Sequence, residues 1–335
     1  MRVAFLILNH REPTQLLRLI KTLRLELPDA AIVVHNDKFR AHLDASALDS
    51  VGNAYLLTSE TPIGWGDFNL VDACWRSMEW ILGHLEFDWL ALLSAQDYPI
   101  KPLARLGEDL AATGADALVL ATPISKLSSR SDRRNRRRRY LYQYRTSAVN
   151  RQPGSASDKV RRWMRGHTRL FVDILNNVQP CFQIYKYPDQ IPWRVGLRAR
   201  RTPFSQSEPC WFGSMWITLS HRAAKLVVDS AKQRRDYVEY YRRTVVADES
   251  ATVTLLCNAP GLRTEARDLH YVRWTDSASG HPDTFSADDL PELLAAPEYF
   301  ARKFDIAQDS DVLDMLDAML ARERSAVKHV APEGS

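Results

Sequence analysis

The 335-residue chain has few cysteines and no long apolar run. Cys74, Cys181, Cys210 and Cys257 are far apart, with no CxxC pair and no histidine at metal-ligand spacing. Such cysteines are typical of reduced, mostly buried thiols. No run reaches the ~18 apolar residues of a membrane span, and the N-terminus, MRVAFLILNH, does not read as a signal peptide. These features favour a cytoplasmic location.

The commonest catalytic motifs are also missing. The chain contains no GxxxxGK[ST] loop, GxGxxG turn, GxSxG elbow or HExxH helix. Those motifs carry the most frequent nucleotide, hydride, ester and zinc chemistries. The function must therefore depend on other residues.

Acidic residues are scarce in one segment. Between Lys126 and Arg169, fifteen Lys/Arg residues accompany two acids, a local charge of +13 in a chain whose net charge is +4. Such a block binds an anionic partner or forms a solvated loop. Arginines interleaved with Tyr140, Tyr142 and Tyr144 would also suit single-stranded nucleic acid, although no nucleic-acid motif accompanies them.

Strand and helix patterns alternate through the first part of the chain. Residues 3–9, VAFLILN, are typical of a strand that is buried on both faces. The further predicted elements are strands over 31–37, 88–94, 116–122 and 271–274 and helices over 13–27, 69–82 and 103–112. This alternation predicts an α/β fold with a mostly parallel sheet flanked by helices.

Polar residues end three of the predicted strands. They are Asn9-His10, His35-Asn36-Asp37 and Ser94-Ala95-Gln96-Asp97. Any one group could be a helix cap or a turn. Because ligands bind beyond the carboxyl ends of parallel strands, we expect the three groups to converge on one cleft.

Seven segments follow one another in an order that we associate with a known family. They are LILNHREPTQLLRLIKTL, VVHNDK, IGWGDFNLVDACW, LLSAQDYPIKP, WFGSMWITLS, ADESATVTLL and YFARKFD. The chain resembles the family 14 glycosyltransferases, which include the core 2 branching N-acetylglucosaminyltransferases and the peptide O-xylosyltransferases. The resemblance covers nearly the whole chain except the basic segment.

The resemblance implies a GT-A glycosyltransferase fold. Residues 1–122 would form the nucleotide-sugar-binding half, and 209–325 the acceptor-binding and catalytic half of the same domain. Residues 123–208 would be a basic, loop-rich insertion and 326–335 a flexible tail.

The resemblance also implies inverting transfer from a UDP-sugar without a metal or other cofactor. Most GT-A enzymes hold Mg²⁺ or Mn²⁺ through an Asp-x-Asp at a strand end, whereas here Ala95-Gln96-Asp97 keeps one carboxylate. The literal Asp309-Ser310-Asp311 precedes a helical pattern and is interpreted as a helix cap.

Without a metal, a departing diphosphate needs fixed positive charge. The resemblance gives this role to Arg302 and Lys303, and we expect Phe300 and Phe304 on either side of them to be buried. A surface turn beside a buried phenylalanine pair is the alternative. The branching enzymes have a further arginine before this motif; GHPDTFSADDL has none, so the arrangement is closer to that of the xylosyltransferases.

The resemblance makes Glu249 the general base that deprotonates the acceptor hydroxyl, with Asp248 as its alternate. Asp248 suits the capping position of the following helix, which would leave Glu249 free for the cleft.

The donor would lie against residues from four motifs. Asp37 would bind the uracil and ribose, with backbone contacts from Leu8 or Asn9, and Asp97 would lie at the third strand end. Trp65, with Asp67, would shape the sugar pocket.

On the acceptor side, Trp211 and Trp216 would line the cleft, and Tyr271 would reach it from a strand end. The basic stretch Arg133–Arg145 would bind an anionic acceptor or make peripheral contact with an anionic membrane.

The sequence thus predicts a cytoplasmic, metal-independent glycosyltransferase that moves GlcNAc or xylose from UDP to a glycan or lipid-linked acceptor. Two alternatives remain open. One is a non-catalytic sugar or nucleotide-sugar binding protein, and the other is nucleic-acid binding through the arginine-rich segment.

Overall fold

A mostly parallel β-sheet forms the centre of the protein. The computed structural model describes residues 1–49, 51–64, 66–146, 172, 174–185, 194–275 and 281–330. Within these residues, seven strands pair in the order β13-β6-β12-β4-β1-β2-β3. Their bounds are β1 Val3–Asn9, β2 Ala31–Asn36, β3 Ala54–Thr58, β4 Trp89–Ser94, β6 Ala117–Leu118, β12 Thr218–Ser220 and β13 Thr264–Glu265. Strands β1 to β4 are parallel and β12 is antiparallel to its neighbours, which confirms the predicted α/β class.

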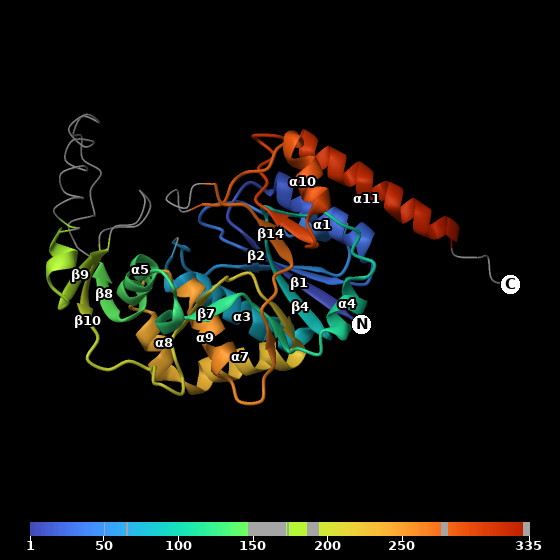
Figure 1. The fold of residues 1–335 in the computed structure, drawn as a ribbon. Coiled ribbons are helices and arrows are strands. Elements are labelled where there is room, and N and C mark those ends of the chain that lie inside the picture. The colour runs from blue at the N-terminus through green and yellow to red at the C-terminus, as the bar shows by residue number, and fades with distance from the viewer. Residues whose placement is uncertain are drawn as a thin grey trace.

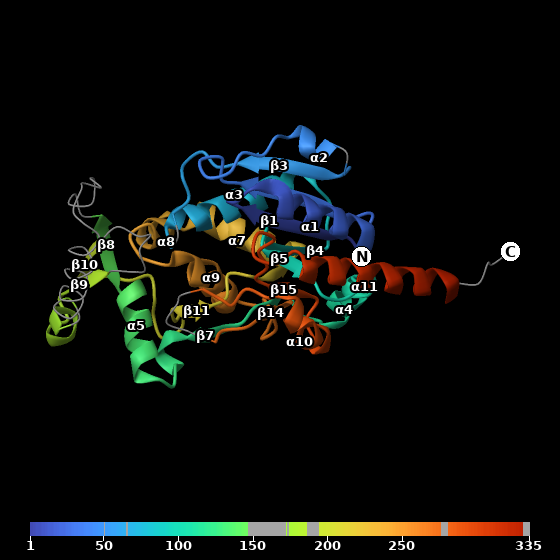
Figure 2. The same ribbon diagram turned by 90° about the horizontal axis from the view of Figure 1, so that it is seen from above.

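Helices cover both faces of this sheet (Figures 1 and 2). The helices are α1 Pro13–Glu26, α2 Ser46–Asp49, α3 Phe68–His84, α4 Leu106–Ala112, α7 His221–Gln233, α8 Arg235–Tyr241, α9 Ala251–Asn258, α10 Leu290–Ala295 and α11 Asp311–Val330. Alternate side chains of β1 enter different cores. Phe5 and Ile7 pack with residues of α1 and α11, whereas Leu6 and Leu8 pack with residues of α3 and α7. Both halves of the chain thus contribute to one layered domain.

A second sheet lies against the carboxyl end of β4. It pairs β14 (His270–Val272) parallel to β15 (Phe300–Arg302), and β15 antiparallel to β5 (Asp97–Pro99). Phe300 and Phe304 are both fully buried, which confirms the expectation for the YFARKFD segment. Two buried aromatic rings therefore fix the backbone that carries Arg302 and Lys303.

The described part of the basic segment is more regular than the sequence suggested. Helix α5 (Arg130–Tyr140) follows a short 3-10 turn, Ile124–Lys126, and a sheet of β8, β10 and β9 packs beside it. These strands are β8 Tyr142–Thr146, β9 Phe182–Tyr185 and β10 Arg194–Arg198. The loop-rich description of 123–208 is wrong for these residues, because Tyr140 and Tyr144 are buried and anchor them. Figure 2 shows α5 at the end of the molecule away from α11.

Two other predicted boundaries are corrected. The strand expected over 116–122 splits into β6 and β7 (Ala121–Pro123), and β7 leaves the central sheet to pair with β11 (Trp211–Gly213). The tail expected over 326–335 begins inside a helix, since α11 continues to Val330. Leu313, Leu316 and Leu320 are buried along that helix and hold it against the core.

Among the described helices, none combines the length and apolar character that crossing a bilayer requires. The four cysteines are free thiols. Cys74 and Cys210 are buried, whereas Cys257 is half-buried and Cys181 is exposed.

Candidate active site

The polar ends of β1, β2 and β4 lie side by side, as predicted. The parallel register places Asn9 opposite Asn36 and Leu8 opposite Ser94. Asn9 Nδ2 donates to Asn36 Oδ1 at 2.7 Å, and both side chains are buried. The Leu8 carbonyl accepts the Ala95 amide at 3.0 Å. These groups bind the strand ends to one another at the base of the predicted donor cleft.

Asp37 organises the loop beyond β2. One carboxylate oxygen accepts the Phe39 amide at 3.1 Å, and the other accepts the Ile63 amide at 3.2 Å. The second oxygen also lies 3.8 Å from Arg40 Nε. Asp37 therefore holds the 59–64 loop against the sheet, and contact with a nucleoside stays a prediction.

Asp97 lies at the centre of a buried charged cluster. Its Oδ2 accepts the Ser94 amide at 2.7 Å and lies 3.2 Å from His270 Nε2. Its Oδ1 lies 3.5 Å from Arg302 Nε, because the β5–β15 register places Arg302 opposite Asp97. The other ring nitrogen of His270, Nδ1, lies 2.8 Å from Asp268 Oδ1. Asp97 Oδ2 thus accepts a backbone hydrogen bond, whereas Oδ1 faces Arg302 without a hydrogen-bond partner among the described residues.

Two opposing effects set the protonation of this cluster. Burial disfavours the charged carboxylate, but Arg302 and His270 hold the pKa of Asp97 below its usual value. Burial also disfavours a charged imidazole, but Asp268 and Asp97 raise the pKa of His270 to about 9. At neutral pH the cluster is therefore an ionised Asp97 between two cations.

A group of cations surrounds the tip of β15. Burial, followed by the charges of Arg11 and Arg302, lowers the pKa of Lys303. Desolvation, followed by Arg11 and Arg40, lowers the pKa of His10 to about 4, so this ring adds no charge near neutral pH. The four residues Arg11, Arg40, Arg302 and Lys303 are called the donor-side cations below. Arg11 pairs with Asp305 at 2.7 Å, and Arg40 and Arg302 lie 3.8 Å and 3.5 Å from Asp37 and Asp97. The structure gives the Lys303 ammonium no hydrogen bond or ion pair with a described residue, so an anion would be stabilised there.

Glu249 lies at the end of the 3-10 turn Ala247–Glu249 and contacts the basic segment. Its Oε2 accepts from Arg136 Nη1 at 3.1 Å and from Arg139 Nη1 at 2.5 Å. Arg136 stacks on Phe212, with 3.5 Å between the guanidinium carbon and the ring centroid. The Glu249 side chain keeps 30% of its surface exposed, so it is held in place and yet accessible to a ligand.

Asp248 does not cap the following helix. The N-cap of α9 is Ser250, and the Asp248 Oδ1 atom is buried without a hydrogen-bond partner in the described part of the chain. Burial and the neighbouring Glu249 raise the pKa of Asp248 to about 7. The capping expectation is therefore wrong, since the 3-10 turn turns Asp248 inward.

A strained residue precedes this pair of acids. Val246 adopts φ +55° and ψ +48°, a left-handed conformation that is unusual for a β-branched side chain. Its amide donates to the Gly66 carbonyl at 2.8 Å, and its carbonyl accepts from the Tyr140 hydroxyl at 3.1 Å. Three distant segments thus fix the turn that presents Glu249, and local strain of this kind is concentrated at functional sites.

The three residues predicted on the acceptor side have different neighbours in the structure. The Arg302 guanidinium carbon lies 4.1 Å from the Trp216 ring centroid, so Trp216 belongs beside the donor-side cations. Trp211 is half-buried and donates from Nε1 to Asn258 Oδ1 at 2.9 Å. Tyr271 stacks on Phe285 and donates to Glu292.

Tyr271 is not brought to the cluster around Asp97. Successive side chains of a strand point to opposite faces, and on β14 it is His270 that faces Asp97. Contact between Tyr271 and an acceptor stays a prediction. Trp65 lies outside the described residues, whereas Asp67, its partner in that prediction, pairs with Arg194.

Sequence reasoning missed His270 and the arginines beside Glu249. No local signal marks His270, because its contact with Asp97 depends on the pairing of β14, β15 and β5. Arg136 and Arg139 stood in a run of four arginines with no feature to distinguish them, although their spacing of three places them on one helical face.

The structure weakens the nucleic-acid alternative. Stacking of bases needs exposed aromatic faces. Tyr140, Tyr142 and Tyr144 are all buried, and their hydroxyls donate to backbone carbonyls. The three tyrosines that suggested this alternative are therefore part of the packed interior and stabilise the fold.

In open α/β sheets, ligands bind in the crevice beyond the carboxyl ends of the strands, and the donor-side cations make that edge of this sheet positively charged. A family model described as Core-2/I-Branching enzyme matches residues 3–295. The chain therefore belongs to this family, the family 14 glycosyltransferases, as the sequence resemblance indicated.

Individual relatives agree with this assignment. Xylosyltransferase oxt of Drosophila pseudoobscura pseudoobscura is 24% identical over 95% of this chain and 33% of its own length. Human xylosyltransferase 1 is 25% identical over 95% of this chain and 30% of its own length. Beta-glucuronosyltransferase GlcAT14A of Arabidopsis thaliana is 30% identical over 42% of this chain and 30% of its own. The chain thus spans about a third of the length of these relatives.

Proposed function

We propose that this protein is a glycosyltransferase that moves a sugar from a UDP-sugar to a hydroxyl group of a glycan or lipid-linked acceptor. The observation that carries the proposal is the group of donor-side cations at the carboxyl edge of the sheet, in a member of a glycosyltransferase family. A diphosphate placed there would relieve the mutual repulsion of Arg11, Arg302 and Lys303.

We further propose inversion by direct displacement. Glu249 accepts the proton of the acceptor hydroxyl as its oxygen attacks the anomeric carbon from the face opposite to UDP. The bond between that carbon and the UDP oxygen breaks, and Arg302 with Lys303 stabilises the charge on the departing diphosphate. Arg136 and Arg139 hold the Glu249 carboxylate in position, and Asp248 remains the alternate base.

Metal independence is part of the proposal. Its support is the positive charge around Asp97, since His270 lies 3.2 Å from Oδ2 and Arg302 lies 3.5 Å from Oδ1. A carboxylate with a buried guanidinium and a protonated imidazole as neighbours is a poor ligand for a divalent cation. The donor-side cations would then supply the charge that Mg²⁺ or Mn²⁺ supplies elsewhere.

The donor is proposed to carry GlcNAc or xylose. A panel of UDP-GlcNAc, UDP-xylose and UDP-glucuronic acid tests this choice; the third is included because two plant relatives are named glucuronosyltransferases. The cognate donor should raise the melting temperature and undergo slow hydrolysis, because a ligand that binds the folded state stabilises it. If neither UDP nor any UDP-sugar stabilises the protein, the proposed donor class is wrong.

Glu249→Gln tests the base. Transfer should fall by about 10²–10⁴-fold, while donor-induced stabilisation is retained. Glu208→Gln, which also removes a salt-bridged carboxylate, is the matched control and should transfer normally. Normal transfer by Glu249→Gln would overturn the assignment. Donor binding with no transfer or hydrolysis by the unaltered protein would favour the non-catalytic binding protein.

The cytoplasmic location and the peripheral membrane contact through Arg133–Arg145 are also proposals. The local charge of +13 between Lys126 and Arg169 supports the membrane contact, and the four free thiols support a reducing compartment.

A further inference from the structure

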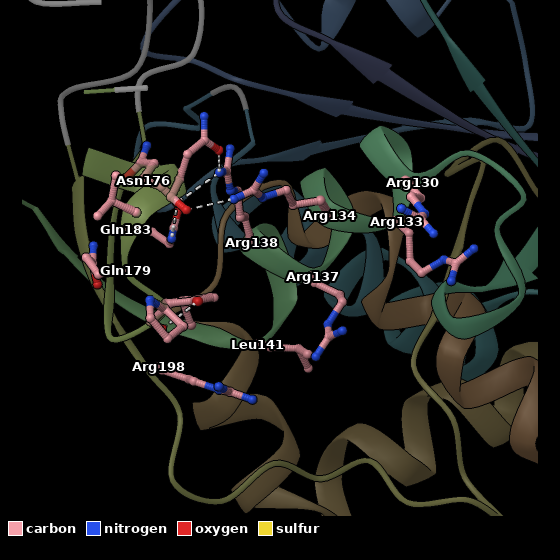
Figure 3. A pocket seen from close by; sticks show the side chains of 14 residues that line it. Arg130, Arg133, Arg134, Arg137, Arg138, Leu141, Asn176, Gln179, Gln183 and Arg198 are labelled. Atoms are coloured by element: carbon pink, nitrogen blue, oxygen red, sulfur yellow. Dashed lines mark hydrogen bonds between the residues drawn. The ribbon is translucent and has the colours of Figure 1, made fainter. Parts of the chain in front are cut away.

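Helix α5 has a second arginine face besides the one that contacts Glu249. Successive residues of a helix are separated by about 100° of rotation. Arg136 and Arg139 therefore share one face, and Arg130, Arg134 and Arg137 share the opposite one. The second face borders a cavity of about 480 Å³ that has no part in the proposed chemistry (Figure 3).

The cavity walls are strongly basic. The described lining residues are Arg130, Arg133, Arg134, Arg137, Arg138, Leu141, Tyr142, Asn176, Asn177, Val178, Gln179, Pro180, Gln183 and Arg198. Six of these are arginines, and none of the lining residues that the structure describes is an aspartate or glutamate. Figure 3 shows α5 supplying the cations along one wall and the amides of Asn176, Gln179 and Gln183 on another.

Some of these arginines build the wall and others remain available. Arg134 donates to the Asn177 carbonyl at 3.2 Å, and Arg138 donates to Asn177 Oδ1 at 2.7 Å. Arg130, Arg137 and Arg198 are exposed, and the structure gives their side chains no hydrogen bond or ion pair with any described residue. The first pair fixes the shape of the cavity, while the other three have guanidinium donors free for a ligand.

The chemistry of the walls indicates the ligand. Several guanidinium groups with no carboxylate beside them favour binding of an oxyanion that carries more than one negative charge. A phosphate group has up to two negative charges and three terminal oxygens, so it meets this requirement. The cavity volume lies within the ~300–1,000 Å³ of small-molecule sites, which exceeds the space that a lone phosphate fills. Asn176 and Gln179 bind backbone groups of the wall through both ends of their side-chain amides. Gln183 Oε1 has no hydrogen-bond partner among the described residues and is suited to accept from a hydroxyl of an attached sugar.

We propose that this cavity binds a phosphate group carried by the acceptor. The proposal rests on the proposed glycosyltransferase function and names the class of acceptor, a phosphorylated glycan. Since α5 contacts the cavity with one face and Glu249 with the other, the same helix would hold the acceptor phosphate and position the base that acts on its hydroxyl.

Calorimetric titration with glucose 6-phosphate tests the site in the 335-residue chain. Arg130→Gln combined with Arg137→Gln should weaken binding about tenfold or more, because each removes a charge-assisted hydrogen-bond donor. Arg322→Gln, which removes an exposed arginine of α11, should bind glucose 6-phosphate as the unaltered protein does. The affinity for UDP should be equal in all three proteins, since neither substitution touches the donor-side cations. Unchanged glucose 6-phosphate affinity in the double variant, or no binding by the unaltered protein, would overturn the proposal.

Sedimentation with vesicles separates two sources of the phosphate. If the phosphate belongs to a soluble glycan, glucose 6-phosphate binds and phosphatidylcholine vesicles containing phosphatidic acid do not compete with it. If it is carried by a lipid, these vesicles displace glucose 6-phosphate, whereas vesicles of phosphatidylcholine alone do not. Arginine-dependent vesicle binding without any sugar-phosphate binding contradicts the glycan-phosphate site and favours a membrane surface.

This test is distinct from that of the proposed function. A protein that binds glucose 6-phosphate through α5 and transfers no sugar refutes the glycosyltransferase and the acceptor role but keeps the phosphate site. Transfer that is equally efficient in the double variant and on phosphate-free acceptors refutes the acceptor-phosphate role and leaves the glycosyltransferase intact.

Discussion

The donor-side cations and the arginines of α5 are held in different ways. Arg302 lies on a strand between two buried phenylalanines, stacks on Trp216 and faces Asp97, so its position is fixed from several sides. Arg130 and Arg137 extend from an exposed helix face toward a cavity. Fixed charge suits a transition state, because it needs no reorganisation when the leaving group develops charge. Exposed arginines such as Arg130 and Arg137 can adjust their side-chain conformation to a ligand, which suits recognition of a group that does not react.

Asp97→Asn should produce the largest loss of stability. It leaves Arg302 and His270 buried without their shared counter-charge, and breaking a buried pair costs about 3–5 kcal/mol. Urea denaturation measures the change in the free energy of unfolding. Asp132→Asn on the exposed face of α5 is the control and should stay within about 0.5 kcal/mol. A similar change in the free energy of unfolding for both variants would contradict the conclusion that buried contacts of Asp97 fix Arg302 in place.

Lys303→Met should lower transfer about 10²-fold, since it removes one cation that stabilises the departing diphosphate while keeping the aliphatic stem. Initial rates at saturating donor and acceptor measure this change. Arg322→Gln, which removes an exposed cation of α11, is the control and should leave the rate unchanged. Equal losses in the two variants would show that net charge matters and that position does not.

The buried histidine predicts a pH dependence of stability. The pKa of His270 is raised to about 9 in the folded protein against about 6.5 in an unfolded chain, so the folded state binds the extra proton between these values. The free energy of unfolding should therefore fall on the order of 1–3 kcal/mol as the pH rises from about 6.5 to above 9.

Urea denaturation as a function of pH measures this dependence. His270→Gln should flatten the profile over the same range, while exposed His42→Gln should not. Stability that rises with pH in this window would contradict the assignment of a protonated His270.

Chelation should have the smallest effect. If the donor-side cations replace a metal ion, transfer in EDTA should equal transfer without it. The measurement is the initial rate before and after exhaustive dialysis against EDTA. Complete loss of activity that Mn²⁺ restores would refute metal independence.

Much of the central fold could be predicted from the sequence because its signals are local. The apolar run Val3–Asn9 and the polar residues that follow it specify a buried strand and its functional end. The prediction failed at Leu120, where the chain leaves one sheet for another, because a continuous apolar stretch does not reveal which partners its two parts have.

Apolar spacing and chain adjacency are enough to predict which charged residues lie beside buried anchors, as Phe300 and Phe304 around Arg302 and Lys303 illustrate. Which charges meet depends on the tertiary fold, since Glu249 and Arg139 are 110 positions apart. His270 likewise meets Asp97 only through the pairing of β14, β15 and β5. Contacts of this kind depend on strand register and helix docking, which no local pattern encodes.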